Sequence, residues 1–149
     1  MNKPDLILLL LHHKLAVITG NWMIIGTASL YLSGYPVSPN DLDILTDANA
    51  AKEIEQALAA YKVETEVKPN NQFRSIFSEY LVSDLKIEVM GDLEVNTPHG
   101  WVLLMDHITD PQFITFAGET FKVPGKADQL RIYTLFNREK DQVILQMLG

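Results

Sequence analysis

Trp22 to Ile25 form a short apolar run, which Gly26 ends abruptly. Four apolar residues in a row, with no alternating polar position, are typical of a strand that is buried on both faces. We therefore expect this segment to be a buried strand of a sheet.

The rest of the chain mixes helix and strand signals. We expect helices from Pro4 to about Ala16, from Thr27 to Ser33 with Gly34 closing it, and through Ala50, Ile54, Ala57 and Leu58 after a cap at Thr46 or Asp47. Strands are expected at Leu42 to Leu45, Lys62 to Val67, Ser75 to Val82 and Lys86 to Met90, with a turn at Ser83-Asp84 and a further hairpin at Phe113 to Val123. Ala127 to Leu148 has helical spacing with a break near Asn137. This mixture predicts an α/β or α+β fold rather than an all-β fold.

The composition is that of a globular protein, and we expect one domain over residues 1–149. The chain has 47% apolar and 21% charged residues, and its net charge of −7 provides no overall positive field for nucleic acid. It contains no cysteine, which excludes thiolate metal sites and gives no sign of an oxidising compartment. The longest apolar run, Leu6 to Leu11, is too short to span a membrane. We therefore expect a cytoplasmic protein without a membrane anchor.

Two carboxylates occur in an otherwise apolar segment, Asp41-Leu42-Asp43-Ile44-Leu45. Side chains at positions i and i+2 of a strand lie on the same face, so Asp41 and Asp43 should share one patch. Like charges at this separation raise a pKa unless a cation neutralises them. Oxygen ligands favour Mg²⁺ or Mn²⁺, and Mg²⁺ commonly also binds phosphate oxygens.

A third acid, Glu88, lies in the apolar segment Lys-Ile-Glu-Val-Met. If its strand lies beside that of Asp41 and Asp43, three carboxylates converge. The alternative is structural: Asp41 in a turn, Asp43 as a cap and Glu88 on an exposed face.

Gly26-Thr27 follows the first strand directly and opens a helix. Free backbone N–H groups at such a turn suit phosphate oxygens, and Thr27 adds a hydroxyl donor. A plain strand-to-helix turn capped by Thr27 is the alternative.

These motifs, in this order, resemble those of the DNA polymerase beta-like nucleotidyltransferase superfamily, above all its small stand-alone, minimal and toxin-like members. The matching residues are Ile25-Gly26-Thr27, Asn40-Asp41-Leu42-Asp43-Ile44 and Ile87-Glu88-Val89, within a similarity that runs from about Trp22 to Val95. The resemblance implies a mixed, twisted sheet flanked by helices. Thr27 stands where the family has Gly or Ser.

The resemblance also implies roles for single residues. Asp41, Asp43 and Glu88 would bind Mg²⁺ or Mn²⁺ and act in catalysis, with Glu88 assisting deprotonation of the acceptor. Gly26 and Thr27 would hold the nucleotide phosphates. The segment REKDQVILQML is similar to a helix start of the toxin-like branch, which makes Arg138 and Lys140 candidate phosphate contacts, although the upstream lysine of those relatives falls here on Tyr133 or a neighbour. Arg74, beside the stretch Lys68 to Phe73, is a further candidate, with a solvated loop as the alternative.

We therefore predict a metal-dependent enzyme that moves a nucleoside monophosphate from an NTP, such as ATP, to a hydroxyl of a small molecule, a tRNA or a protein. The alternative is a catalytically silent nucleotide-binding protein of the same fold, or one half of a toxin–antitoxin pair. The leucine-rich first helix or an edge strand would allow a homodimer.

Overall fold

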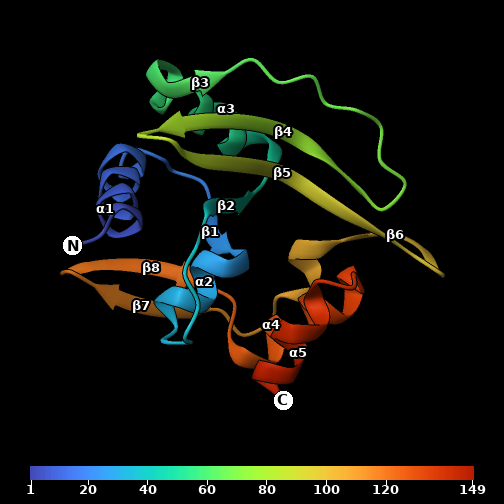
Figure 1. Cartoon of the computed structure of the whole chain (residues 1–149). Coiled ribbons are helices and arrows are strands. Elements are labelled where there is room, and N and C mark those ends of the chain that lie inside the picture. The colour runs from blue at the N-terminus through green and yellow to red at the C-terminus, as the bar shows by residue number, and fades with distance from the viewer.

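A six-stranded mixed sheet forms the centre of the computed structural model, which describes residues 1–149 (Figure 1). Its order is β1 (Trp22–Ile25), β2 (Asp41–Thr46), β5 (Leu85–Thr97), β4 (Phe73–Val82) and β3 (Lys62–Val63), and β6 (Gly100–Leu103) pairs with the end of β5. β2 and β5 run parallel, and the other neighbouring strands are antiparallel. The predicted mixture of helices with an antiparallel component is confirmed.

Helices cover both faces of this sheet (Figure 1). α1 (Lys3–Leu15) and α3 (Ala48–Ala57) contribute to the apolar cluster on one face, and α4 (Lys126–Phe136) and α5 (Asp141–Leu148) to the cluster on the other. Along β1, Ile24 belongs to the first cluster, while Met23 and Ile25 belong to the second. The apolar run is therefore buried on both sides, as its sequence predicted.

Local sequence signals set most of the element boundaries. The Asp47 side chain accepts a hydrogen bond from the Ala50 N–H at 2.7 Å and starts α3. Ser83 and Asp84 both have positive φ, 48° and 67°, as the tight turn of the β4–β5 hairpin requires. Asn137, with φ of 49°, ends α4 and separates it from α5.

The strand expected at Lys62 to Val67 is wrong beyond Val63. Only Lys62 and Val63 pair with β4, and residues 64–72 have no regular structure. Pro69 has no N–H to donate to a neighbouring strand, and the residues before it carry charges that stay in solvent. β5 is also longer than expected, because β6 folds back across Pro98 and His99 to pair with its last residues.

The chain between β1 and β2 contains α2 (Gly26–Leu32), which begins one residue earlier than predicted. A separate hairpin, β7 (Gln112–Phe116) and β8 (Glu119–Val123), has the expected turn at Ala117-Gly118 and contacts α1 and β1 through β8. Two 3-10 turns, η1 (Ala59–Tyr61) and η2 (Leu104–His107), complete the elements. None of the helices combines the length and the apolar character needed to cross a bilayer.

Candidate active site

The register of β2 and β5 brings three carboxylates together. Asp43 is the Cα partner of Glu88 across the parallel pair, and Asp41 lies two residues earlier on the same strand. Each of the three offers one oxygen, and these oxygens lie within 4.8 Å of one another. Asp41, Asp43 and Glu88 therefore converge, and the alternative in which Glu88 lies on a separate exposed face does not describe the structure.

The environment of this cluster disfavours three negative charges. Burial, followed by the charges of Asp41 and Glu88, raises the pKa of Asp43 to about 7. Burial and then Asp41 also raise the pKa of Glu88, although the ammonium of Lys86, 4.0 Å from its Oε1, acts in the opposite direction. Nearby cations such as Arg138 and Lys86 therefore offset only part of the repulsion among these carboxylates. A cluster of carboxylate oxygens in this state fits a hard divalent cation such as Mg²⁺ or Mn²⁺.

Gly26 lies directly against the cluster. A Cβ atom at this position would lie 2.6 Å from Asp43 Oδ2, and the φ of Gly26 is +70°. Both the space and the backbone conformation therefore require glycine. Thr27 follows in the first turn of α2, and both residues line the same cavity as the carboxylates.

That cavity has a volume of about 750 Å³ and lies over the sheet face that α4 and α5 cover. All eight residues singled out from the sequence line it, namely Gly26, Thr27, Asp41, Asp43, Arg74, Glu88, Arg138 and Lys140. Its volume is within the range of pockets that hold small ligands. The structure thus places residues from five separate parts of the chain around one space.

The two basic residues near the C-terminus differ in how they are held. The Arg138 guanidinium donates two hydrogen bonds to the carboxylate of the buried Asp141, at 2.8 and 2.9 Å, and lies 4.8 Å from the centre of the Phe136 ring. Its orientation is therefore fixed. Its positive charge acts to lower the pKa of Asp43, but burial and the neighbouring carboxylates outweigh this effect. Lys140 makes no ion pair and is free to turn toward an anion in the cavity.

Arg74 lies at the cavity with its charge already paired. Its guanidinium donates to both carboxylate oxygens of Glu94, at 3.1 and 2.9 Å, and stacks 4.1 Å from the centre of the Trp101 ring. A phosphate group would have to compete with Glu94 for this side chain. The role of Arg74 as a phosphate contact stays a prediction.

Glu79 and Tyr133 also line the cavity, and the sequence identified neither of them as a site residue. Glu79 on β4 is the Cα partner of Glu88, which extends the row of acids across a third strand. Because side chains alternate along a strand, Glu79 lies on the same sheet face as Phe77, which also lines the cavity. Tyr133 on α4 is buried but also lines the cavity, where burial and the charges of Asp141 and Asp43 raise its pKa.

The sequence matches no protein-family model and no curated protein. Solved structures match over nearly the whole chain. TM1012 of Thermotoga maritima, a candidate nucleotidyltransferase, is 25% identical with a TM-score of 0.78, covering 98% of this chain and 93% of that one. The lincosamide antibiotic adenylyltransferase LnuA, solved with lincomycin, is 16% identical with a TM-score of 0.63, covering 99% and 96%. ANT(2″)-Ia, solved with adenylyl-2″-tobramycin, is 8% identical with a TM-score of 0.65, covering 99% and 88%.

The fold is therefore the nucleotidyltransferase fold that the sequence resemblance implied. TM1012, at 25% identity over 98% of this chain, also supports nucleotidyltransferase as the enzyme class.

Proposed function

We propose that residues 1–149 form one nucleotidyltransferase domain that moves a nucleoside monophosphate from an NTP to a hydroxyl group of an acceptor. The observation that carries this proposal is the convergence of Asp41, Asp43 and Glu88 beside Gly26, on the wall of a cavity of about 750 Å³. When bound, Mg²⁺ or Mn²⁺ would neutralise phosphate charge and polarise the reacting phosphoryl group.

The three carboxylates would hold the divalent cation, which fits their converging oxygen donors and the raised pKa values of Asp43 and Glu88. Glu88 would also accept the proton of the acceptor hydroxyl. A carboxylate within the cluster that also faces the cavity is suitably placed to act as a general base toward such a hydroxyl.

The phosphates would lie between the Gly26 turn and the C-terminal cations. The N–H groups of Gly26 and Thr27 and the Thr27 hydroxyl would donate hydrogen bonds to the β- and γ-phosphates, since both residues line the cavity next to Asp43. Arg138, held by Asp141, and the unpaired Lys140 would supply positive charge from the connection between α4 and α5. These contacts orient the α-phosphorus toward the acceptor.

A small molecule is the acceptor that the site favours. The cavity has the volume of a small-ligand pocket, and the net charge of −7 disfavours a polyanion such as tRNA. LnuA was solved with lincomycin and ANT(2″)-Ia with adenylyl-2″-tobramycin, so a lincosamide and an aminoglycoside are the first acceptors to test.

The first test measures nucleotide binding by calorimetry, with a non-hydrolysable NTP and Mg²⁺. Wild type should bind, and Asp43→Asn should bind at least tenfold more weakly in a site that depends on this carboxylate. Asp92→Asn is a matched control, because Asp92 is exposed on β5 and does not line the cavity. Equal binding by all three proteins would refute the assignment of the metal and nucleotide site.

The second test measures transfer of label from an NTP labelled at the α-phosphate to a lincosamide, an aminoglycoside, tRNA or protein. Label should reach one acceptor class with wild type and not with Asp43→Asn. Tight nucleotide binding without label in any acceptor would instead support the silent nucleotide-binding protein, including a toxin–antitoxin partner.

A further inference from the structure

A buried chain of hydrogen bonds links α4 to the Gly26 turn. The Gln129 Nε2 group on α4 donates to Ser29 Oγ at 2.9 Å, across 100 residues of sequence. The Ser29 hydroxyl in turn donates to the carbonyl oxygen of Gly26 at 2.6 Å. Both side chains are almost completely buried, with 2% and 0% of their residue surface exposed. This series of hydrogen bonds ends at Gly26, which lies directly against the Asp43 carboxylate.

The chemistry of its neighbours fixes the orientation of the Gln129 amide. The Ser29 hydroxyl has given its only hydrogen to Gly26, so it can only accept a hydrogen bond from Gln129. The second neighbour, the carbonyl oxygen of Pro124 at 3.4 Å, is also an acceptor. The amide must therefore present its NH₂ group to both.

This orientation leaves Gln129 Oε1 without a partner, and it is the one buried side-chain polar atom in the structure in that state. An unsatisfied buried oxygen is destabilising, whereas an apolar side chain of the same shape would avoid that penalty. The free energy gained by burying a side chain therefore does not explain why residue 129 is a glutamine. What the amide does provide is a donor that holds Ser29 in place.

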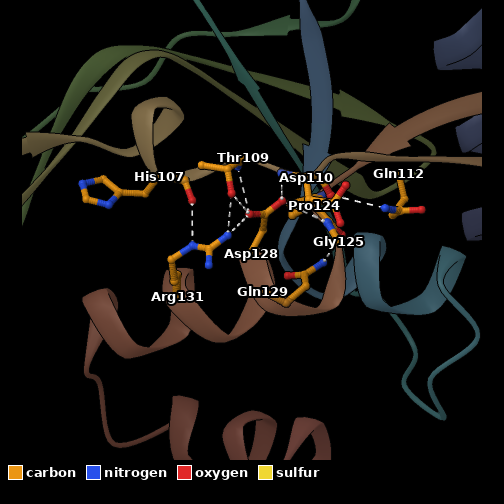
Figure 2. Close-up of polar contacts among 9 residues, drawn as sticks. All are labelled: His107, Thr109, Asp110, Gln112, Pro124, Gly125, Asp128, Gln129 and Arg131. Carbon is orange, nitrogen blue, oxygen red and sulfur yellow. Dashed lines mark hydrogen bonds and ion pairs between the residues drawn. The ribbon is translucent and has the colours of Figure 1, made fainter.

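A second cluster fixes the position of Gln129 itself (Figure 2). The carboxylate of Asp128, the preceding residue, accepts hydrogen bonds from the N–H groups of Thr109 at 2.9 Å, Asp110 at 2.9 Å and Gly125 at 3.3 Å. It also pairs with Arg131, whose Nε donates to the carbonyl oxygen of His107 at 3.1 Å. The start of α4 is thereby bound to residues 107–110. These hydrogen bonds fix the first turn of α4, from which Gln129 reaches Ser29.

The Gly26 turn is sensitive to small displacements. Its Cα lies so close to Asp43 that even a methyl group has no room, and Thr27 follows directly. A movement of the turn would change both the space beside the Asp43 carboxylate and the direction of the Gly26 and Thr27 N–H groups. Displacements below 1 Å are large enough to alter binding and catalysis in a preorganised site.

We propose that Gln129 is a positioning residue, which acts through the Ser29 hydroxyl to hold the Gly26 turn against Asp43. Its effect on nucleotide binding rests on the proposed function, whereas the fixed position of the turn does not. The two parts are therefore tested by separate measurements.

The first measurement follows the turn by backbone amide NMR shifts and hydrogen exchange. Gln129→Met should shift the amide signals of residues 26–28 and speed their exchange, while the folded spectrum elsewhere is retained. Gln56→Met, at an exposed position on α3, and Ile132→Val, at a buried position on α4, serve as controls for the side-chain change and for loss of core packing. Unchanged signals at residues 26–28 in Gln129→Met would overturn the proposal, whether or not the protein binds nucleotide.

The second measurement combines Ser29→Ala with Gln129→Met. Ser29→Ala alone leaves the buried amide with only the long bond to Pro124 and should lower the melting temperature. The double variant removes both polar partners and should recover most of that loss, because paired apolar replacement is nearly neutral.

Affinity for a non-hydrolysable NTP with Mg²⁺ should not recover in the double variant. We expect it to stay about fivefold to tenfold weaker than wild type, the size of effect that loss of one or two positioning hydrogen bonds produces. Affinity that returns together with stability would show a merely structural role and overturn the proposal. Absence of nucleotide binding by wild type would overturn the proposed function, and the NMR result would still decide the position of the turn.

Discussion

Asparagine at position 43 should make the metal-free protein more stable at alkaline pH. Asp43→Asn keeps the size and shape of the side chain and removes its negative charge. In wild type, burial and the charges of Asp41 and Glu88 raise the pKa of Asp43 from 3.8 to about 7. The folded protein therefore holds this carboxylate in an unfavourable state when it is ionised.

The size of the effect follows from the difference between the two pKa values. Each pKa unit corresponds to about 1.4 kcal/mol, so a rise from 3.8 to about 7 corresponds to up to about 4 kcal/mol, which solvent at the cavity mouth reduces. Below about pH 4, Asp43 is protonated in both the folded and the unfolded chain, so its raised pKa does not lower the free energy of unfolding. Between about pH 4 and pH 7 the unfolded chain ionises first, so wild-type stability falls. Above about pH 7 the loss is complete.

Urea unfolding in the presence of EDTA measures this difference. Wild type and Asp43→Asn should differ little near pH 4, and the variant should be more stable by up to about 4 kcal/mol near pH 8. Mg²⁺ added near pH 8 should stabilise wild type and have little effect on the variant, because binding to the folded state alone raises stability. Equal pH profiles for the two proteins, or a wild type that gains stability from pH 5 to pH 8 relative to the variant, would refute the reasoning.

Three further perturbations test the surroundings of the site. Gly26→Ala should lower the free energy of unfolding by about 1–2 kcal/mol in urea and abolish NTP binding, because its Cβ would lie 2.6 Å from Asp43 Oδ2 at a φ of +70°. Asp141→Asn should weaken NTP binding in calorimetry several-fold, because Arg138 loses its charged partner; unchanged affinity would contradict this. Burial would raise the pKa of Asp128, but backbone N–H groups and Arg131 hold it below its usual range, so Asp128→Asn should lower the melting temperature near pH 7 and by progressively less as the pH falls below about 4.

The sequence predicted the elements whose signals are local. Asp47, Gly34 and Asn137 end or begin helices at the expected places, since capping depends on a few neighbouring residues. The expected strand at Lys62 to Val67 failed beyond Val63. The charges and Pro69 that follow disfavour a strand, but the residue at which the chain leaves the edge of β4 depends on how long the two segments stay side by side in the folded sheet. β6 was missed for the same reason.

At the site, the spacing of Asp41 and Asp43 determined by itself that both carboxylates share one face, because side chains alternate along a strand. The family resemblance indicated Glu88 and Gly26 as their partners. Only the tertiary structure decided that β2 and β5 pair in parallel with Asp43 opposite Glu88, and that Gln129 reaches Ser29 from 100 residues away. Such contacts depend on strand register and helix packing, which arise from the whole core rather than from the residues that carry the chemistry.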